Sequence, residues 1–183
     1  MFSAPSGAGK TSLVRFLMQR FPAFKFSVSY TSRPRRGQEI HGVDYYYVSV
    51  KRFRLLIKQD FFVEWEEVYP NHYYGTPHQP VLDCIETNNV LLLDLDVRGG
   101  LTFKKKYPEQ TLAVFVGVSG LQVLEARLRK RGTDSEAKIQ TRLAKAALED
   151  CHSSEFDVIL INDELEKAQK DLLYLLKQNG YCP

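Results

Sequence analysis

Residues 4–11 read Ala-Pro-Ser-Gly-Ala-Gly-Lys-Thr and stand directly before a segment whose apolar residues have helical spacing. Gly7 and Gly9 allow the backbone to curl so that successive N–H groups point inward. Lys10 can then reach β- and γ-phosphate oxygens, and Thr11 can ligate Mg²⁺. The dipole of the following helix adds a field that favours anions. This stretch predicts a polyphosphate-binding loop that opens a helix.

The residues around the loop decide whether the match is more than chance. Gly-Lys-Thr alone is a weak signal, and the full loop normally begins with glycine, where this chain has Ala4. Apolar residues recur at helical spacing directly after Thr11, as a loop that opens a helix requires. They are Leu13, Val14, Leu17 and Met18. We therefore interpret residues 4–11 as a functional phosphate loop.

Length and composition fit one compact domain. The chain has 183 residues, of which 44% are hydrophobic, enough to bury a sizeable core. Cys84, Cys151 and Cys182 have no paired metal spacing, and their odd number fits reduced thiols. No apolar run approaches the roughly 20 residues of a membrane span, and the first residues lack a signal pattern. We expect a soluble cytoplasmic protein without a membrane partner.

Positive charge is concentrated in two short segments. The net charge is +3, and arginines cluster at 33–36 and at 127–131. Separate clusters suit small phosphorylated ligands as well as a nucleic-acid duplex. A nucleic-acid binder would have no use for the glycine-rich loop, so we expect no nucleic-acid partner.

Three continuous apolar segments predict strands buried on both faces of a sheet. They are residues 90–93, 111–118 and 156–161, and the first ends in Asp94 and Asp96. Helical patterns at 98–106, 120–131, 135–151 and 163–178 alternate with them. This alternation predicts a parallel sheet covered by helices. Ligands bind at the carboxyl ends of such strands, where the loop and both aspartates emerge.

Residues 30–80 have a different character. Residues 43–48 and 61–68 alternate like half-exposed strands, a helix opens at Ser49, and turn residues punctuate the segment. We predict antiparallel pairing there. The strand that feeds the phosphate loop is short, comprising only Met1 and Phe2.

Several motifs in one order resemble the guanylate kinase family over nearly the whole chain. Besides the loop they are 27–33 (Ser-Val-Ser-Tyr-Thr-Ser-Arg), 42–45 (Gly-Val-Asp-Tyr), 62–65 (Phe-Val-Glu-Trp), 73–76 (Tyr-Tyr-Gly-Thr), 93–96 (Leu-Asp-Leu-Asp), 131–134 (Arg-Gly-Thr-Asp) and 161–163 (Ile-Asn-Asp). The resemblance implies a single α/β domain over 1–183 with a P-loop parallel sheet covered by helices. The core would comprise 1–29, 81–119 and 152–183. A small mixed antiparallel GMP-binding subdomain would span 30–80, and a helical lid 120–151.

The resemblance also implies a kinase of purine nucleotide metabolism that transfers phosphoryl directly from ATP to GMP, and we expect dGMP to be accepted as well. ATP would contact Ser6, Gly7, Ala8, Gly9, Lys10, Thr11, Ser12 and Asn162. Mg²⁺, the implied cofactor, would be held by Thr11 and, through water, by Asp94.

For GMP, the resemblance gives Glu64 the two neighbouring guanine donors, N1–H and the 2-amino group. Ser29 and Thr76 would donate to O6, and Asp96 would accept from the amino side. The residues alone leave a bland alternative for Glu64, a solvated strand residue, since Glu66 and Glu67 follow it. The phosphate clamp would comprise Arg33, Arg36, Tyr45 and Tyr74. Arg35 is a competing candidate, and ordinary strand aromatics are the alternative for the two tyrosines.

Arginines of the lid complete the implied catalytic set with Lys10. They are Arg127, Arg131 and Arg142, whereas Arg129, Lys130 and Lys138 suit a solvated helix face. The competing interpretation is a guanylate-kinase-like module that binds proteins without catalysis. A pure binding module has no physical need to keep the full charged set. The oligomeric state is open.

Overall fold

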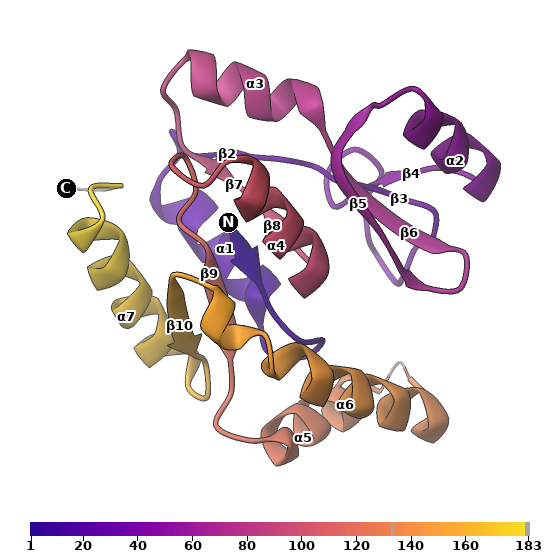
Figure 1. The fold of residues 1–183 in the computed structure, drawn as a ribbon. Helices are drawn as coiled ribbons and strands as arrows, with labels where there is room; N and C mark the ends of the chain where they lie inside the picture. The colour runs from indigo at the N-terminus through magenta and orange to yellow at the C-terminus, as the bar shows by residue number, and fades with distance from the viewer. Residues whose placement is uncertain (133, 182–183) are drawn as a thin grey trace.

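The computed structural model describes residues 1–132 and 134–181, so Cys182 lies outside the described residues. Its core is a parallel sheet flanked by helices, with a small second sheet beside it (Figure 1). The central strands run in the order β10-β9-β1-β8, all parallel. They are β1 (Phe2–Ser3), β8 (Asp94–Leu95), β9 (Val114–Gly117) and β10 (Val158–Ile161). The predicted α/β class is confirmed.

Two further strands continue the line of the sheet. β2 (Lys25–Phe26) pairs in parallel with β7 (Leu91–Leu92), and only Leu93 separates β7 from β8. β1 has two residues, as predicted, and pairs on both sides: Phe2 lies opposite Asp94 and Val114. The phosphate loop therefore leaves the sheet between β8 and β9.

The helices match the predicted segments to within a few residues. Three helices are α1 (Lys10–Arg20), α4 (Val97–Lys106) and α7 (Leu165–Gln178). The two helices of the predicted lid, called the lid helices below, are α5 (Leu121–Arg131) and α6 (Glu136–Asp150), and a 3-10 turn, η1 (Ser153–Glu155), follows them. One helix was not predicted, α3 (His78–Glu86). Pro77 is the N-cap residue of this helix and Pro80 lies in its first turn, where proline is tolerated because backbone N–H groups there need no internal partner.

Residues 30–80 form the second sheet and one helix. The strands β3 (Tyr30–Thr31), β4 (Tyr46–Tyr47), β5 (Phe62–Tyr69) and β6 (His72–Pro77) run in the order β4-β3-β6-β5. β6 is antiparallel to β3 and β5, but β3 and β4 are parallel. The prediction of antiparallel pairing is wrong for this last pair, because a long loop rather than a hairpin joins its strands.

A separate apolar cluster holds this second sheet together. α2 (Val50–Lys58) begins at Ser49, whose hydroxyl accepts from the Arg52 N–H at 3.1 Å. Its fully buried Phe53 stacks on Phe62 and Tyr73, with ring centroids 4.6 and 5.4 Å apart. The predicted division into core, GMP-binding subdomain and lid stays a prediction, and its boundary at residue 80 falls inside α3.

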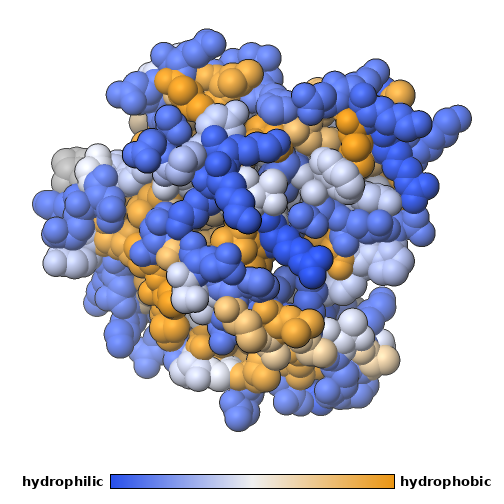
Figure 2. All heavy atoms as spheres, in the orientation of Figure 1, coloured by the Kyte–Doolittle hydropathy of each residue, from blue (hydrophilic) through white to orange (hydrophobic). Residues whose placement is uncertain are grey.

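Two larger clusters pack the faces of the central sheet. α1 and α7 cover one face with Leu13, Leu17 and Leu172, and α4 packs Phe103 against Phe115 on the other. Hydrophilic side chains dominate the face seen in Figure 2, with apolar patches between them, one of them over α3. Within the described residues, no helix combines the length and apolar character needed to cross a membrane.

Candidate active site

A cleft of about 770 Å³ opens where the phosphate loop leaves β1. Three parts of the chain form its walls: the loop with α1, the second sheet with its long loop, and the lid helices α5 and α6. Most predicted site residues line it, namely Ser6, Gly7, Gly9, Lys10, Thr11, Ser12, Ser29, Arg33, Arg36, Tyr45, Tyr74, Asp94, Asp96, Arg127, Arg131 and Arg142. Glu64 lines a small adjoining pocket that shares Lys10, Ser29, Tyr45, Tyr74, Asp94 and Asp96.

The loop has the backbone that a phosphate cradle needs. Gly7 and Gly9 have φ angles of 100° and 90°, in the left-handed region where glycine carries no steric penalty. Gly9 is the residue that precedes α1, so the first-turn N–H groups of this helix point toward the cleft wall formed by the loop. This geometry suits an anion.

The charged groups of the loop are paired with Asp94. Lys10 Nζ lies 2.6 Å from Asp94 Oδ1 and also donates to the Leu95 carbonyl. The Thr11 hydroxyl donates to Asp94 Oδ2 at 3.2 Å. Asp94 and the phosphate loop therefore lie together at the carboxyl ends of the strands, where the sequence predicted them.

The Thr11 hydroxyl and the Asp94 carboxylate are the oxygens that Mg²⁺ would need here. Among the described residues, no group of three or more His, Cys, Asp or Glu could hold a metal ion. Mg²⁺ does not need such a cage, because it keeps several waters and binds one or two protein oxygens together with substrate phosphates. The adjacent hydroxyl and carboxylate oxygens of Thr11 and Asp94 are hard ligands of this kind, so the residues fit the ion.

Two side chains brace the loop from behind. Asn162 is 2% exposed and its Nδ2 donates to the Ala8 carbonyl at 2.7 Å. Arg127 Nη2 donates to the carbonyls of Asn162 and Asp163 at 2.7 and 2.9 Å. Ala8 is fully buried, so it and Asn162 lie outside the cleft walls. The contact of Asn162 with adenine stays a prediction, and a role in holding the loop is what sequence reasoning missed.

Glu64 lies buried in the small pocket that adjoins the cleft. It is 5% exposed, which contradicts the alternative of a solvated strand residue. Thr76, itself fully buried, donates its hydroxyl to Glu64 Oε1 at 2.5 Å, so it supports the carboxylate rather than lining the cleft. Burial raises the pKa of Glu64 to about 7, and the neighbouring charge of Asp96 adds to this rise.

Arg33 is the centre of a preorganised cationic group. It is 4% exposed, and its guanidinium donates to both Glu39 oxygens at 2.6 Å and to the Tyr74 hydroxyl at 3.0 Å. Its Cζ lies 4.9 Å from the centre of the Tyr45 ring. Burial alone would raise the pKa of Glu39, but hydrogen bonds from Arg33, Tyr47 and the Arg36 N–H lower it to about 2.

Sequence reasoning missed Glu39 as the partner of Arg33. A buried arginine needs a carboxylate, and Glu39 is the acid nearest in sequence to Arg33, so a signal existed. Of the two competing arginines, Arg36 lines the cleft, whereas the guanidinium of Arg35 lies 5.3 Å from the Tyr47 ring.

The lid arginines differ in how they are held. Arg142 is 9% exposed; its Nε lies 3.1 Å from Asp134 Oδ2, and its Nη1 donates to the Ser6 hydroxyl. Arg131 is exposed at the rim of the cleft. Arg129 pairs with Glu125 and Glu136 on the outer face, as a solvated residue would. Asp134, two residues before α6, therefore pairs with an arginine of that same helix.

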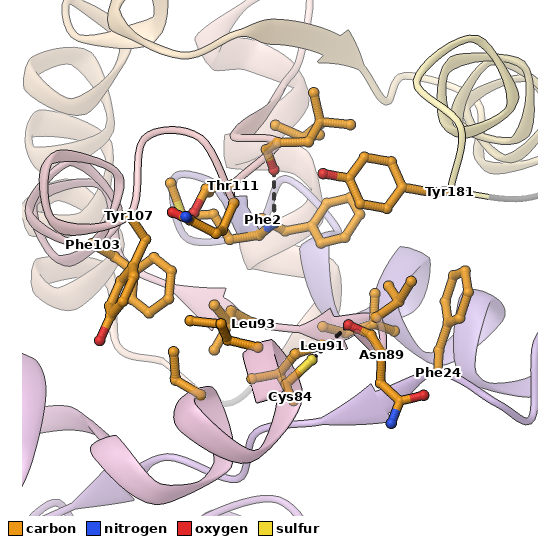
Figure 3. A pocket seen from close by; sticks show the side chains of 18 of the residues that line it. Phe2, Phe24, Cys84, Asn89, Leu91, Leu93, Phe103, Tyr107, Thr111 and Tyr181 are labelled. Atoms are coloured by element: carbon orange, nitrogen blue, oxygen red, sulfur yellow. Dashed lines mark hydrogen bonds between the residues drawn. The ribbon is translucent and has the colours of Figure 1, made fainter. Parts of the chain in front are cut away.

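A second cavity, of about 540 Å³, lies at the opposite end of β1. There the Met1 amino group donates to the Leu112 carbonyl at 2.8 Å. The side chains around the cavity include Phe24, Leu91, Phe103 and Tyr181 (Figure 3). Among the described residues, no lysine or arginine side chain lines this cavity.

Comparisons with known proteins agree with this geometry. The guanylate kinase family model matches residues 1–179. A guanylate kinase of Bacteroides thetaiotaomicron is 41% identical over 178 residues, which cover 97% of this chain and 87% of that protein. One from Thermosynechococcus vestitus is 44% identical over 168 residues, covering 92% of this chain and 87% of the relative.

A solved structure gives the same result. The crystal structure of guanylate kinase from Anaplasma phagocytophilum superposes with a TM-score of 0.81 at 25% identity, covering 97% of this chain and 83% of that one. A shikimate kinase from Bacteroides thetaiotaomicron, with a TM-score of 0.54 at 15% identity, shares the fold alone. The chain belongs to the guanylate kinase family.

Proposed function

We propose that GMP and ATP bind end to end in the cleft and that the γ-phosphoryl group passes directly in line from one to the other. The activity itself, phosphorylation of GMP with ATP, follows from membership of the family. The observation that carries the proposed geometry is that the phosphate loop and a cationic group line one cleft, and that the pocket adjoining this cleft holds a buried carboxylate.

The guanine ring would lie against Glu64. Its N1–H and 2-amino group are adjacent donors that one carboxylate accepts together, and adenine lacks this pair. A site that leaves a buried carboxylate unpaired rejects the wrong base by roughly 10⁴ to 10⁵. Ser29, 7% exposed and lining both pockets, would donate to O6. The free oxygen of Asp96 would accept from the amino side.

The phosphate of GMP would be held by Arg33, Arg36, Tyr45 and Tyr74. Glu39 holds Arg33 in place and occupies both arms of its guanidinium, so Arg33 would add only a single N–H, and Arg36 would supply the fork. The planar fork of arginine suits phosphate oxygens. An acceptor held in this way would present one oxygen toward the phosphate loop.

ATP would be gripped at the loop by Ser6, Gly7, Gly9, Lys10, Thr11 and Ser12, whereas the buried Ala8 would support the loop from behind together with Asn162. Lys10 and the lid arginines 127, 131 and 142 would balance negative charge as it spreads over the transferring group. Such an arginine contributes about 10³ to 10⁵ in rate. Mg²⁺, held by Thr11 and through water by Asp94, would neutralise phosphate charge. No covalent enzyme intermediate is required.

A coupled assay of ADP formation tests the proposal with GMP, dGMP, AMP, CMP and UMP offered in turn. We expect turnover with GMP and dGMP and almost none with the others. K10A should abolish transfer, and E64Q should lower the preference for GMP over AMP. Equal use of AMP and GMP by the unmodified protein would contradict the role of Glu64, and unchanged kinetics in K10A would contradict that of Lys10. A cytoplasmic location also stays a prediction.

A further inference from the structure

Gly99 lies in the first turn of α4, directly against Glu64 on β5. Asp96 precedes this helix, and its Oδ1 accepts from the N–H groups of Arg98 and Gly99 at 3.0 and 3.1 Å. A Cβ built on Gly99 would lie 2.5 Å from Glu64 Oε2, 3.2 Å from its Cδ and 3.5 Å from Asp96 Oδ2. The carboxylates of Glu64 and Asp96 therefore converge on a residue that has no side chain.

Away from position 99, the space open to Glu64 is the small pocket in which guanine is proposed to bind. The Glu64 side chain is 5% exposed, and its other oxygen accepts from the fully buried Thr76 at 2.5 Å. Any side chain at position 99 would have to break this hydrogen bond or move the carboxylate by about 1 Å. Displacements of that size at a binding constellation cost up to about 10²-fold.

We propose that Gly99 is a positioning residue for guanine recognition: the space it leaves holds the Glu64 carboxylate beside Asp96, at the positive end of α4. The helix N-terminus favours the charged form of an acid placed there. The inference rests on the proposed role of Glu64 in binding GMP. It adds that Gly99 is what allows the Glu64 carboxylate to lie where it does.

The test compares the steady-state kinetics of G99A and G100A. G99A should raise KM for GMP about 10- to 100-fold while KM for ATP, and kcat at saturating GMP, stay within about threefold. G100A is the matched control, because the same change one residue along would meet Ser3 and Met1 instead of Glu64. If G100A impairs the enzyme, KM for GMP and KM for ATP should rise by similar factors. The same selective rise of KM for GMP in both variants would overturn the inference.

A rescue experiment separates positioning from general damage. E64D shortens the acid by one methylene and withdraws it from a Cβ at position 99. We expect E64D to raise KM for GMP in the unmodified protein but to lower it in the G99A background. Strictly additive effects would overturn the inference. Should G99A not fold, recovery of folding in the G99A/E64D variant would support the clash with Glu64, and failure of both would overturn it.

The outcomes also distinguish this inference from the proposed function. If E64Q and E64D leave KM for GMP unchanged, the role of Glu64 itself fails. If those variants are impaired but G99A binds GMP normally, only the positioning role of Gly99 fails.

Discussion

Lowering the pH should weaken GMP binding through Glu64. Its pKa is raised to about 7 by burial, with a smaller contribution from the charge of Asp96. Only the ionised carboxylate can accept both guanine donors, so binding of GMP has to release the proton that the acid holds below this pKa. At pH 6 about one tenth of Glu64 is ionised, and apparent affinity should fall about tenfold from its plateau, or about 1.4 kcal/mol.

Lowering the pH should have the opposite effect on folding: it should stabilise the protein without GMP. An acid whose pKa is higher in the folded protein than in the unfolded chain binds more protons when folded. For Glu64 the protein without GMP therefore loses stability as pH rises from about 4.5 to about 7. GMP, whose donors pair with the charge, should offset this loss most at and above neutral pH.

The assay is KM for GMP at saturating ATP between pH 5.5 and 8.5, with calorimetry in two buffers of different ionisation enthalpy to count released protons. E64Q is the control, because it keeps the contribution of the GMP phosphate, which titrates near pH 6. The unmodified protein should show a steeper dependence than E64Q and should release a proton near pH 6.5. Identical pH profiles, with no proton released, would refute the reasoning.

Three further predictions concern the supports of the site and the small sheet. E39Q removes the charge that Arg33 pairs with, so urea unfolding should show a loss of about 1–3 kcal/mol, and KM for GMP should rise more than KM for ATP; an equal rise for both substrates would contradict this. N162A removes the hydrogen bond to the Ala8 carbonyl, so it should raise KM for ATP and lower the free energy of unfolding. Unchanged ATP kinetics would contradict a role of Asn162 in holding the phosphate loop. F53A opens the stacked cluster of the small sheet and should cost about 3–5 kcal/mol in a denaturant titration, and a loss below about 1 kcal/mol would mean that the cluster contributes little.

The sequence predicted the parts of the fold that depend on the spacing and type of neighbouring residues. The phosphate loop, the buried strands ending at Asp94 and the helices that alternate with them follow from spacing and composition. α3 was missed because it begins directly after the turn residues that end at Pro77, with Pro80 in its own first turn. The parallel pairing of β3 with β4 was missed because the long loop between them gives no sign of which strands are neighbours.

The site was less accessible to sequence than the fold. Local pattern alone favoured a solvated Glu64, and only the resemblance gave it a role, since its burial depends on α4 and on Thr76. The pairs Arg142–Asp134 and Asn162–Ala8 join residues that no spacing rule connects. Such contacts depend on the packing of separate elements, so they become visible only in three dimensions.

The ion pair between Lys10 and Asp94 has a consequence for the order of events at the loop. An ammonium whose charge is already balanced attracts stray inorganic anions weakly, because each would have to compete with an attached carboxylate at 2.6 Å. If the nucleotide binds as its Mg²⁺ complex, Thr11 and Asp94 would hold the ion, and Lys10 would then be available to pair with phosphate oxygens. The loop would thereby discriminate in favour of the metal complex and against free phosphate before any chemistry begins.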